Sequence, residues 1–214
     1  MPMDSNHSER EIPLPQHPLR CHYSSCLRKN IALQSLSEPE FRDLEKILSI
    51  DDIARNDTLL VQGDSDLHQI FILQGLLKRV VTNKQGREMT LRIVGEGEYE
   101  TCYAAWCLGT RAPYSIIAVK PSIVAKCAMP TWNRFMDTHP ALKRDFELRV
   151  MQHMYEITAH TITLRLFDAS GRLARLQDKH PELLEHLSHK ELAQYLGISP
   201  ETLSRLIHHQ AEVS

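Results

Sequence analysis

The first regular pattern of apolar and polar positions is a short amphipathic stretch after residue 36. Ser37 and Glu40 have the spacing of a capping box, and Pro39 suits the first turn of a helix. The apolar positions of this stretch share one helical face: Phe41, Leu44, Ile47 and Leu48. The pattern predicts a helix that begins at Ser37 and packs on a core.

From about residue 53 to 130, brief apolar runs alternate with turn residues. Such runs precede the turns Gln62-Gly63-Asp64, Gln74-Gly75 and Asn83-Lys84-Gln85-Gly86. Short strands separated at this regular spacing are typical of antiparallel rolls and barrels. Because helical patterns flank this region on both sides, we expect an α+β fold with an antiparallel β-roll.

A helical period replaces the strand pattern from about residue 139 to 167. Five positions recur at alternating intervals of four and three residues: Val150, Met154, Ile157, Thr161 and Leu164. This two-heptad seam favours pairing with a second helix, so we expect it at a dimer interface. The alternative, that the same stripe packs on the roll of its own chain, stays open.

The sharpest pattern surrounds Gly197. Ser188 and Glu191 form a second capping box, Gly197 supplies the positive φ that ends the helix, and Ser199 with Pro200 begins another. The apolar positions of both helices point inward: Leu192, Ala193, Leu196, Leu203, Leu206 and Ile207. This is the sequence form of a helix-turn-helix, which also occurs as ordinary core packing.

The second helix presents a polar face suited to base edges in a DNA major groove. Arg205 can bond a guanine bidentately, Glu201 can accept from the amino group of a cytosine, and Ser204 can bond either a base or a phosphate. Ser199 and Thr202 are adjacent candidates for DNA contacts. We therefore expect DNA binding rather than catalysis, since no Ser-His-Asp grouping, P-loop or paired carboxylates support an enzyme.

These patterns divide the chain into four parts: a polar, flexible N-terminal arm over 1–30, a β-roll sensor domain over 31–130, a dimerisation helix over 131–167, and a helix-turn-helix domain over 168–214. Apolar runs stay too short for a membrane span, and prolines replace the apolar core of a signal peptide near the N-terminus. We expect a cytoplasmic protein without a membrane partner.

Composition lowers the expected strength of nonspecific binding to DNA. The chain has 25 Lys and Arg against 27 Asp and Glu, a formal charge of -2, and 42% hydrophobic residues, which excludes a disordered or polybasic protein. Residues 168–214 carry the same balance of -2, from five basic and seven acidic residues. Nonspecific attraction to phosphates must then be weak, and binding must depend on local contacts.

The assembly of roll, long helix and terminal helix-turn-helix resembles the bacterial family of the cyclic-AMP receptor protein and the fumarate-nitrate reduction regulator. The markers are Gln62-Gly63-Asp64, Ile72-Leu73-Gln74-Gly75, Gly86-Arg87-Glu88, Gly95-Glu96-Gly97-Glu98-Tyr99 and the run from Tyr195 to Leu206. The resemblance implies a homodimeric transcription regulator that binds double-stranded DNA and RNA polymerase. The order of Glu201, Ser204 and Arg205 resembles the oxygen-responsive branch, which implies TTGAT-type half-sites.

Two departures from the family pattern give rival hypotheses. Family members usually continue past the recognition helix into a β-hairpin wing, and this sequence shows none, which suggests a sensor or dimerisation partner without autonomous DNA binding. The stretches Glu100–Tyr103 and Arg111–Ser115 stand where nucleotide-binding members present their ribose carboxylate and their Arg-Ser or Arg-Thr pair. The ribose carboxylate is missing from the first stretch, and Arg111 in the second lacks its neighbouring hydroxyl residue, so a cyclic-nucleotide-binding module is the less favoured alternative.

Five cysteines, an odd number, argue against a disulfide framework. The resemblance implies a [4Fe-4S] cluster in which Cys21, Cys26 and Cys127 take the positions of family ligands. The fourth ligand is Cys102, Cys107, His22 or absent. Haem, zinc, a reversible disulfide between Cys21 and Cys26, and no cofactor at all remain alternatives. In the last case the cysteines of the strands are small buried hydrophobes.

Overall fold

The structure is a computed structural model that describes residues 11–213, in which the chain divides into two compact units. The first unit contains the chain up to residue 79 together with residues 93–152. The second contains residues 80–92 and the chain from residue 153 onward. The β5–β6 hairpin and the long helix α5 therefore contribute residues to both units.

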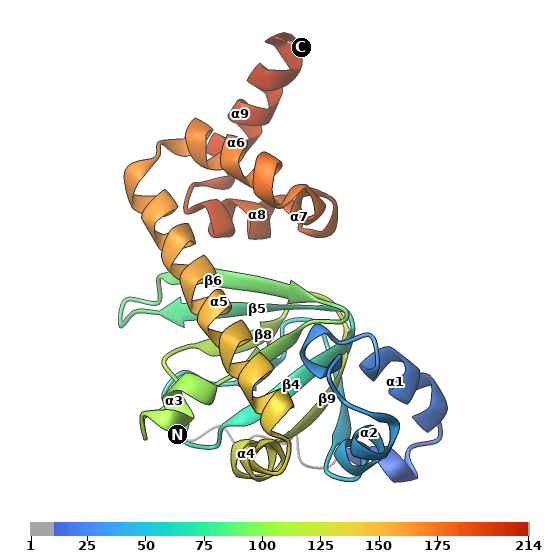
Figure 1. Ribbon diagram of the computed structural model, residues 1–214. Coiled ribbons are helices and arrows are strands. Elements are labelled where there is room, and N and C mark those ends of the chain that lie inside the picture. The colour runs from blue at the N-terminus through green and yellow to red at the C-terminus, as the bar shows by residue number, and fades with distance from the viewer. Residues whose placement is uncertain (1–10, 214) are drawn as a thin grey trace. The chain divides into compact units, whose positions relative to one another are not determined.

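Two sheets form the roll (Figure 1). The larger has the strand order β1-β2-β9-β4-β7, and the smaller has the order β3-β8-β5-β6. The strands are β1 (Ile12–Pro13), β2 (Ser49–Ile53), β3 (Thr58–Leu60), β4 (His68–Gln74), β5 (Leu76–Thr82), β6 (Glu88–Gly95), β7 (Tyr99–Thr101), β8 (Ser115–Ala118) and β9 (Ser122–Ala128). The antiparallel roll expected from the sequence is confirmed.

The turn between β4 and β5 requires a glycine. Gly75 has a φ of 98°, and a Cβ atom there would lie 2.3 Å from the Oγ of Ser122 and 2.7 Å from the carbonyl oxygen of Pro121. Side chains rarely adopt such a φ, and no atom fits into that space. Gly75 thus permits β4 to pair with β9 up to the very end of the strand, where Gln74 lies opposite Ile123.

Helices precede, interrupt and follow the roll. They are α1 (Arg20–Leu27), α2 (Glu38–Glu45), α3 (Tyr103–Cys107), α4 (Met129–Asp137), α5 (Pro140–Leu166), α6 (Ala169–Lys179), α7 (Pro181–His186), α8 (His189–Leu196) and α9 (Pro200–Val213), with short 3₁₀ turns at Leu14–Gln16 and Ile31–Leu33. The predicted capping box begins α2, because Glu40 accepts from the backbone N–H of Ser37 at 2.8 Å. Within the described part of the chain, no helix is long and apolar enough to cross a bilayer.

An aromatic cluster anchors α4 and the first turns of α5 to the sheet. Trp132 of α4 is fully buried, and its ring meets Phe71 of β4 and Phe146 of α5 edge-on, with centroids 5.4 and 5.3 Å away. Phe146 also contacts the ring of Tyr99 at 5.3 Å. Edge-to-face contacts add to the gain from burying these large apolar surfaces.

The expectation of a flexible arm over residues 1–30 is wrong for the part of it that the structure describes. β1 pairs with β2, and Leu14, Tyr23 and Leu27 are buried in the core of the roll. Arg20 fixes α1 further through an ion pair with Glu45, 2.7 Å long. Tyr23 and Leu27 lie one turn apart on the buried face of α1, a pattern that the polar composition hides.

The predicted dimerisation helix over 131–167 consists of two helices rather than one. α4 ends at Asp137, and α5 begins at Pro140. Proline lacks the N–H that would continue the hydrogen-bond ladder of α4, so it separates the two helices and begins the second.

Replacement of Trp132 tests the aromatic cluster. We expect Trp132→Ala to lower the free energy of unfolding by about 3–5 kcal/mol, because the side chain is fully buried and its loss leaves a cavity. Trp132→Phe keeps one ring against Phe71 and should lose clearly less. Denaturant unfolding followed by circular dichroism measures the free energy of unfolding of both variants. Equal decreases in the two would contradict the role of the aromatic contact between residue 132 and Phe71.

Candidate nucleic-acid interface

The first helix of the predicted helix-turn-helix is α8, whose N-terminus is closed by its own side chains. Glu191 accepts a hydrogen bond from the backbone N–H of Ser188 at 3.0 Å, and Ser188 Oγ accepts one from the N–H of Glu191 at 3.3 Å. The predicted capping box is therefore confirmed. Leu192, Ala193 and Leu196 are buried, as the sequence pattern requires.

Gly197 makes the turn between the two helices. Its φ is 64°, in the left-handed region that favours glycine. The N–H of Ile198 donates to the carbonyl oxygen of Ala193 at 3.0 Å, which satisfies a carbonyl that the end of α8 leaves free. The chain then changes direction within three residues and begins α9.

Arg172 of α6 braces this turn, a role that the sequence analysis missed. Its Nε donates to the carbonyl oxygen of Phe167 at 2.8 Å, and its Nη1 donates to that of Leu196 at 3.1 Å. One side chain therefore links the residue after α5 with the end of α8. No local sequence pattern reveals the contact with α8, because Leu196 lies 24 positions from Arg172 in the chain.

The start of α9 follows the predicted pattern. Ser199 Oγ accepts a hydrogen bond from the backbone N–H of Thr202 at 3.2 Å, and Pro200 occupies the first turn. The hydroxyls of Ser199 and Thr202 lie 3.1 Å apart. Both residues were predicted as DNA contacts, and in the free protein their side chains close the N-terminus of the helix.

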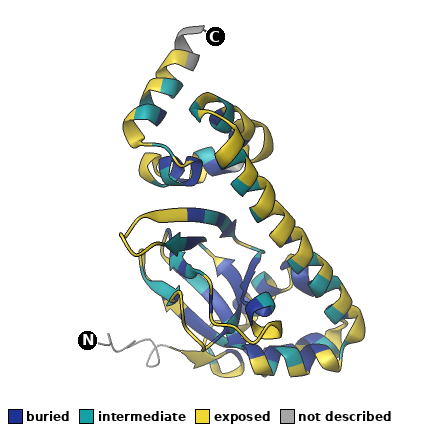
Figure 2. Cartoon of the chain, turned by 90° about the vertical axis from the view of Figure 1, so that its left-hand side faces the viewer, coloured by how far each residue is buried: buried dark blue, intermediate teal, exposed yellow. Residues whose placement is uncertain are grey.

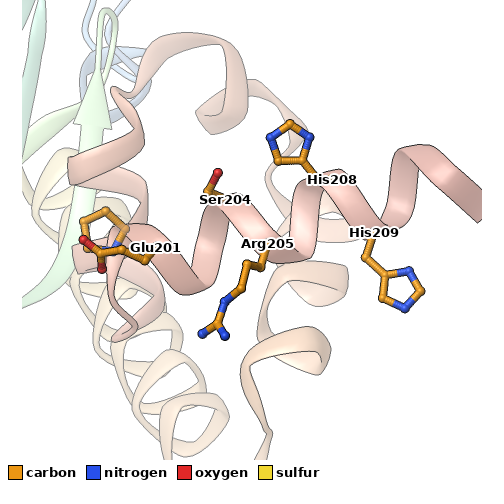
Figure 3. Close-up of a pocket in the computed structure, with 6 residues that line it drawn as sticks. Glu201, Ser204, Arg205, His208 and His209 are labelled. Atoms are coloured by element: carbon orange, nitrogen blue, oxygen red, sulfur yellow. The ribbon is translucent and has the colours of Figure 1, made fainter.

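The outward face of α9 gathers the three residues predicted to meet base edges. Glu201, Ser204 and Arg205 line one shallow, open pocket together with Pro200, His208 and His209. Arg205 and His209 extend to one side of the helix in Figure 3, and Ser204 and His208 extend to the other. The opposite face of the helix holds Leu203, which is fully buried, and the half-buried Leu206 and Ile207.

The charges on this face are set by local contacts. Hydrogen bonds from its own backbone N–H and from Ser199 lower the pKa of Glu201, and Arg205 adds to the effect. Glu201 is therefore an acceptor at neutral pH, and its position in the first turn suits the positive end of the helix dipole. Arg205 Nη2 donates to Thr202 Oγ1 at 3.3 Å and remains exposed.

Two histidines of α5 pack within the second unit. His160 stacks on Tyr195 of α8, with ring centroids 4.2 Å apart and planes 14° from parallel. Burial lowers the pKa of His160, and the neighbouring His180 and Arg172 act in the same direction. His153 is also buried and lies 3.0 Å from Nη2 of Arg92.

The predicted seam on α5 does not coincide with the exposed apolar stripe of that helix. Val150 packs against the core of the roll, and Ile157, Thr161 and Leu164 are half-buried within their own chain. Of the predicted set only Met154 is exposed, whereas the outer side of α5 is yellow in Figure 2. The large apolar side chains exposed there recur at helical intervals: Leu148, Met151, Tyr155, Ile162 and Leu166.

The predicted cysteine ligands are not brought together. Cys21 and Cys26 lie on α1, where Cys26 Sγ is 3.8 Å from His22 Nε2, while Cys127 is buried in β9 and Cys102 precedes α3. Burial raises the pKa of Cys127 to about 12 and that of Cys102 to about 11, which favours neutral thiols over metal-binding thiolates. Among the described residues no three potential ligand side chains are grouped for a metal ion, so this arrangement does not fit a [4Fe-4S] cluster.

Sequence comparison finds two kinds of similarity. The profile of the cyclic nucleotide-binding domain family matches residues 51–139. The cAMP-activated global transcriptional regulator CRP of Pasteurella multocida is 20% identical over 160 residues, which cover 70% of this chain and 77% of that protein. The matched region thus extends beyond the roll.

Comparison with solved structures supports the same fold over a larger share of the chain. The c-di-GMP responsive global regulator CLP of Xanthomonas campestris has a TM-score of 0.68 at 16% identity, covering 82% of this chain and 93% of that one. FixK2 of Bradyrhizobium japonicum has a TM-score of 0.67 at 13% identity, covering 78% and 85%.

Substitution of Gly197 tests the turn. We expect Gly197→Ala to destabilise α8 and α9 by about 1–2 kcal/mol, because a Cβ atom disfavours the left-handed conformation. Gly197→Asn should cost less, since asparagine tolerates this region better. Hydrogen exchange measured by mass spectrometry reports on the two helices separately from the roll. Unchanged protection in the alanine variant would show that the turn does not need a glycine.

Proposed function

Because the chain belongs to the family of the cyclic-AMP receptor protein and the fumarate-nitrate reduction regulator (CRP/FNR), we propose that it is a transcription regulator that binds double-stranded DNA through α9. Two copies act together as a dimer and, by resemblance to the family, recruit RNA polymerase. A signal received by the roll resets the positions of the two recognition helices relative to successive major grooves.

The observation that carries this proposal is the composition of the exposed face of α9. Glu201, Ser204 and Arg205 lie next to one another there, at the N-terminal end of a helix whose start is capped and whose back is buried. The N-terminal residues of a recognition helix are the ones that face base edges. An ionised acceptor and a guanidinium one turn apart can read both bases of one G·C pair.

The expected target follows from this pair and from the family resemblance. TTGAT-type half-sites contain a single G·C pair, whose guanine O6 and N7 suit Arg205 and whose cytosine amino group suits Glu201. His208 and His209, which lie on the same exposed face, are placed to meet a phosphate when they are protonated. Because residues 168–214 have a formal charge of -2, specific contacts must supply most of the affinity.

Loss of the Arg205 guanidinium tests the recognition face. We expect Arg205→Ala to weaken binding to a TTGAT-N4-ATCAA duplex by about 5- to 150-fold in a gel-shift titration, since one bidentate base contact contributes about 1–3 kcal/mol. A duplex with the G·C pair of each half-site inverted should bind the wild type weakly. The variant should distinguish the two duplexes less well than the wild type does, because only Glu201 then remains to read the pair.

Lys46→Ala is the matched control, because it removes one positive charge from an exposed position in the roll. It should change the affinity less than about twofold, as expected for a charge outside the interface. Absence of any shift with the wild-type protein, at both low and moderate salt, would instead favour the rival hypothesis of a partner without DNA binding of its own.

The exposed stripe on α5 is the surface that we assign to the dimer in place of the predicted seam. Leu148 is 51% exposed, Met151 61% and Tyr155 75%, and the three share one side of the helix. A monomer that leaves such large apolar side chains in water over several turns gains stability when a second copy covers them. The spacing of three and four residues suits the antiparallel or parallel pairing of two such helices.

A charge placed in this stripe tests the assignment. We expect Met151→Lys to raise the dimer dissociation constant about tenfold or more, because the new ammonium group would be buried without a partner. Glu156→Lys places the same side chain on an exposed position outside the stripe and should leave the dimer intact. Sedimentation measurements over a range of concentrations distinguish the two. A dimer that tolerates Met151→Lys but is lost on substitution of Ile157 would restore the original seam.

A further inference from the structure

A buried ion pair joins the two sheets in the interior of the roll. Arg79 comes from β5 of the smaller sheet and Glu100 from β7 of the larger one. Their side chains are 3% and 0% exposed. Arg79 Nε donates to Glu100 Oε2 at 3.0 Å, and Nη2 donates to the same oxygen.

The guanidinium group of Arg79 is enclosed on its remaining sides. Its Cζ lies 4.1 Å from the centroid of the Tyr114 ring, and Nη2 also donates to the carbonyl oxygen of Thr101 at 3.4 Å. Tyr114 is held in place because its hydroxyl donates to the same carbonyl at 2.7 Å. Cys102, which is 1% exposed, completes the surroundings of the pair.

Arg79 keeps its charge in this interior. Burial alone would lower its pKa, but the Glu100 carboxylate outweighs that effect and leaves the pKa raised. Sites that bind a carboxylate or a phosphate often contain a charged guanidinium group. In such a site the group is buried, an aromatic ring covers its face, and its N–H groups donate to the oxyanion. In this protein the oxyanion is the carboxylate of Glu100, which belongs to the same chain.

The contacts around Arg79 come from two stretches of the chain, one that begins in β7 and one that leads into β8. Glu100 belongs to the stretch Glu100–Tyr103 and Tyr114 to the stretch Arg111–Ser115, both within the matched domain. Arg111 itself is exposed and donates to the carbonyl oxygen of Gly63 at 3.0 Å, so it does not reach Arg79. The interior cation therefore has Glu100 as its anionic partner.

We propose that Glu100 is a tethered anion that fills a latent oxyanion site centred on Arg79, so that a diffusible small carboxylate binds inside the roll only where the Glu100 carboxylate has been removed. The site in the wild-type protein is closed to cyclic nucleotides for the same reason, because a nucleotide phosphate would have to displace a carboxylate held on the same chain. This proposal concerns the roll alone and does not depend on DNA binding.

Chemical rescue tests the proposal. Glu100→Ala removes the four heavy atoms that acetate contains, namely two carbons and two oxygens. We expect the variant to melt at a lower temperature than the wild type, and acetate at constant ionic strength to raise its Tm by on the order of 5 °C relative to chloride. Wild-type protein should show no such difference, and calorimetry should detect no heat of binding for cyclic AMP.

Two control variants isolate the site. Glu100→Gln keeps the volume of the side chain and so leaves no space for acetate. The double variant, which combines Arg79→Met with Glu100→Leu, removes both charges while keeping the interior filled. Neither should respond to acetate. If Glu100→Ala is recovered only unfolded, its refolding yield from denaturant in acetate and in chloride replaces the melting experiment.

Three results would overturn the proposal. The first is an equal Tm, or an equal refolding yield, of Glu100→Ala in acetate and in chloride. The second is an acetate response of the same size in the double variant, which lacks the guanidinium. The third is binding of cyclic AMP to the wild-type protein that is lost in that double variant, which would make the interior an open nucleotide site.

Discussion

The arrangement of the candidate DNA-binding helices depends on a single left-handed residue, Gly197. Gly197 ends α8. Only Ile198 and Ser199 separate it from the start of α9, so its conformation sets the direction in which α9 begins. Arg172 holds this turn from outside, since it donates to the carbonyl oxygen of Leu196 and also to that of Phe167. The direction of the recognition face is therefore fixed by backbone conformation and by hydrogen bonds to backbone carbonyls, with little contribution from the side chains that would read DNA.

The two units use arginine in contrasting ways. Arg172 is partly exposed and bonds neutral carbonyl oxygens, so its charge keeps contact with water while its fork joins two segments. Arg79 is fully enclosed and has a carboxylate as its partner. Loss of one member of such a buried pair leaves an uncompensated charge, whereas loss of Arg172 removes only bonds to the backbone. An ion pair thus joins the two sheets of the roll, whereas hydrogen bonds to backbone carbonyls hold the turn at Gly197.

Local signals account for what the sequence predicted correctly. The capping boxes at Ser37 and Ser188 and the turn at Gly197 depend on residues within a few positions of one another, and the structure contains all three. The errors arise where distant packing decides. Residues 11–30 are ordered because Leu14 enters a core built by other elements, and periodicity alone could not show which stripe of α5 faces inward. The cysteines matched family positions in the sequence, but the fold places Cys127 in β9, apart from Cys21 and Cys26 on α1.

The stacking of His160 on Tyr195 links the folding of the second unit to protons. Because burial holds the pKa of this imidazole below its ordinary value, the folded unit favours the neutral ring more strongly than the unfolded chain does. Its contribution to stability is therefore complete above the unfolded pKa and is lost as the pH falls through the folded one. In mildly acidic solution His160 loses its proton when the second unit folds. Lowering the pH therefore weakens the contact between α5 and α8.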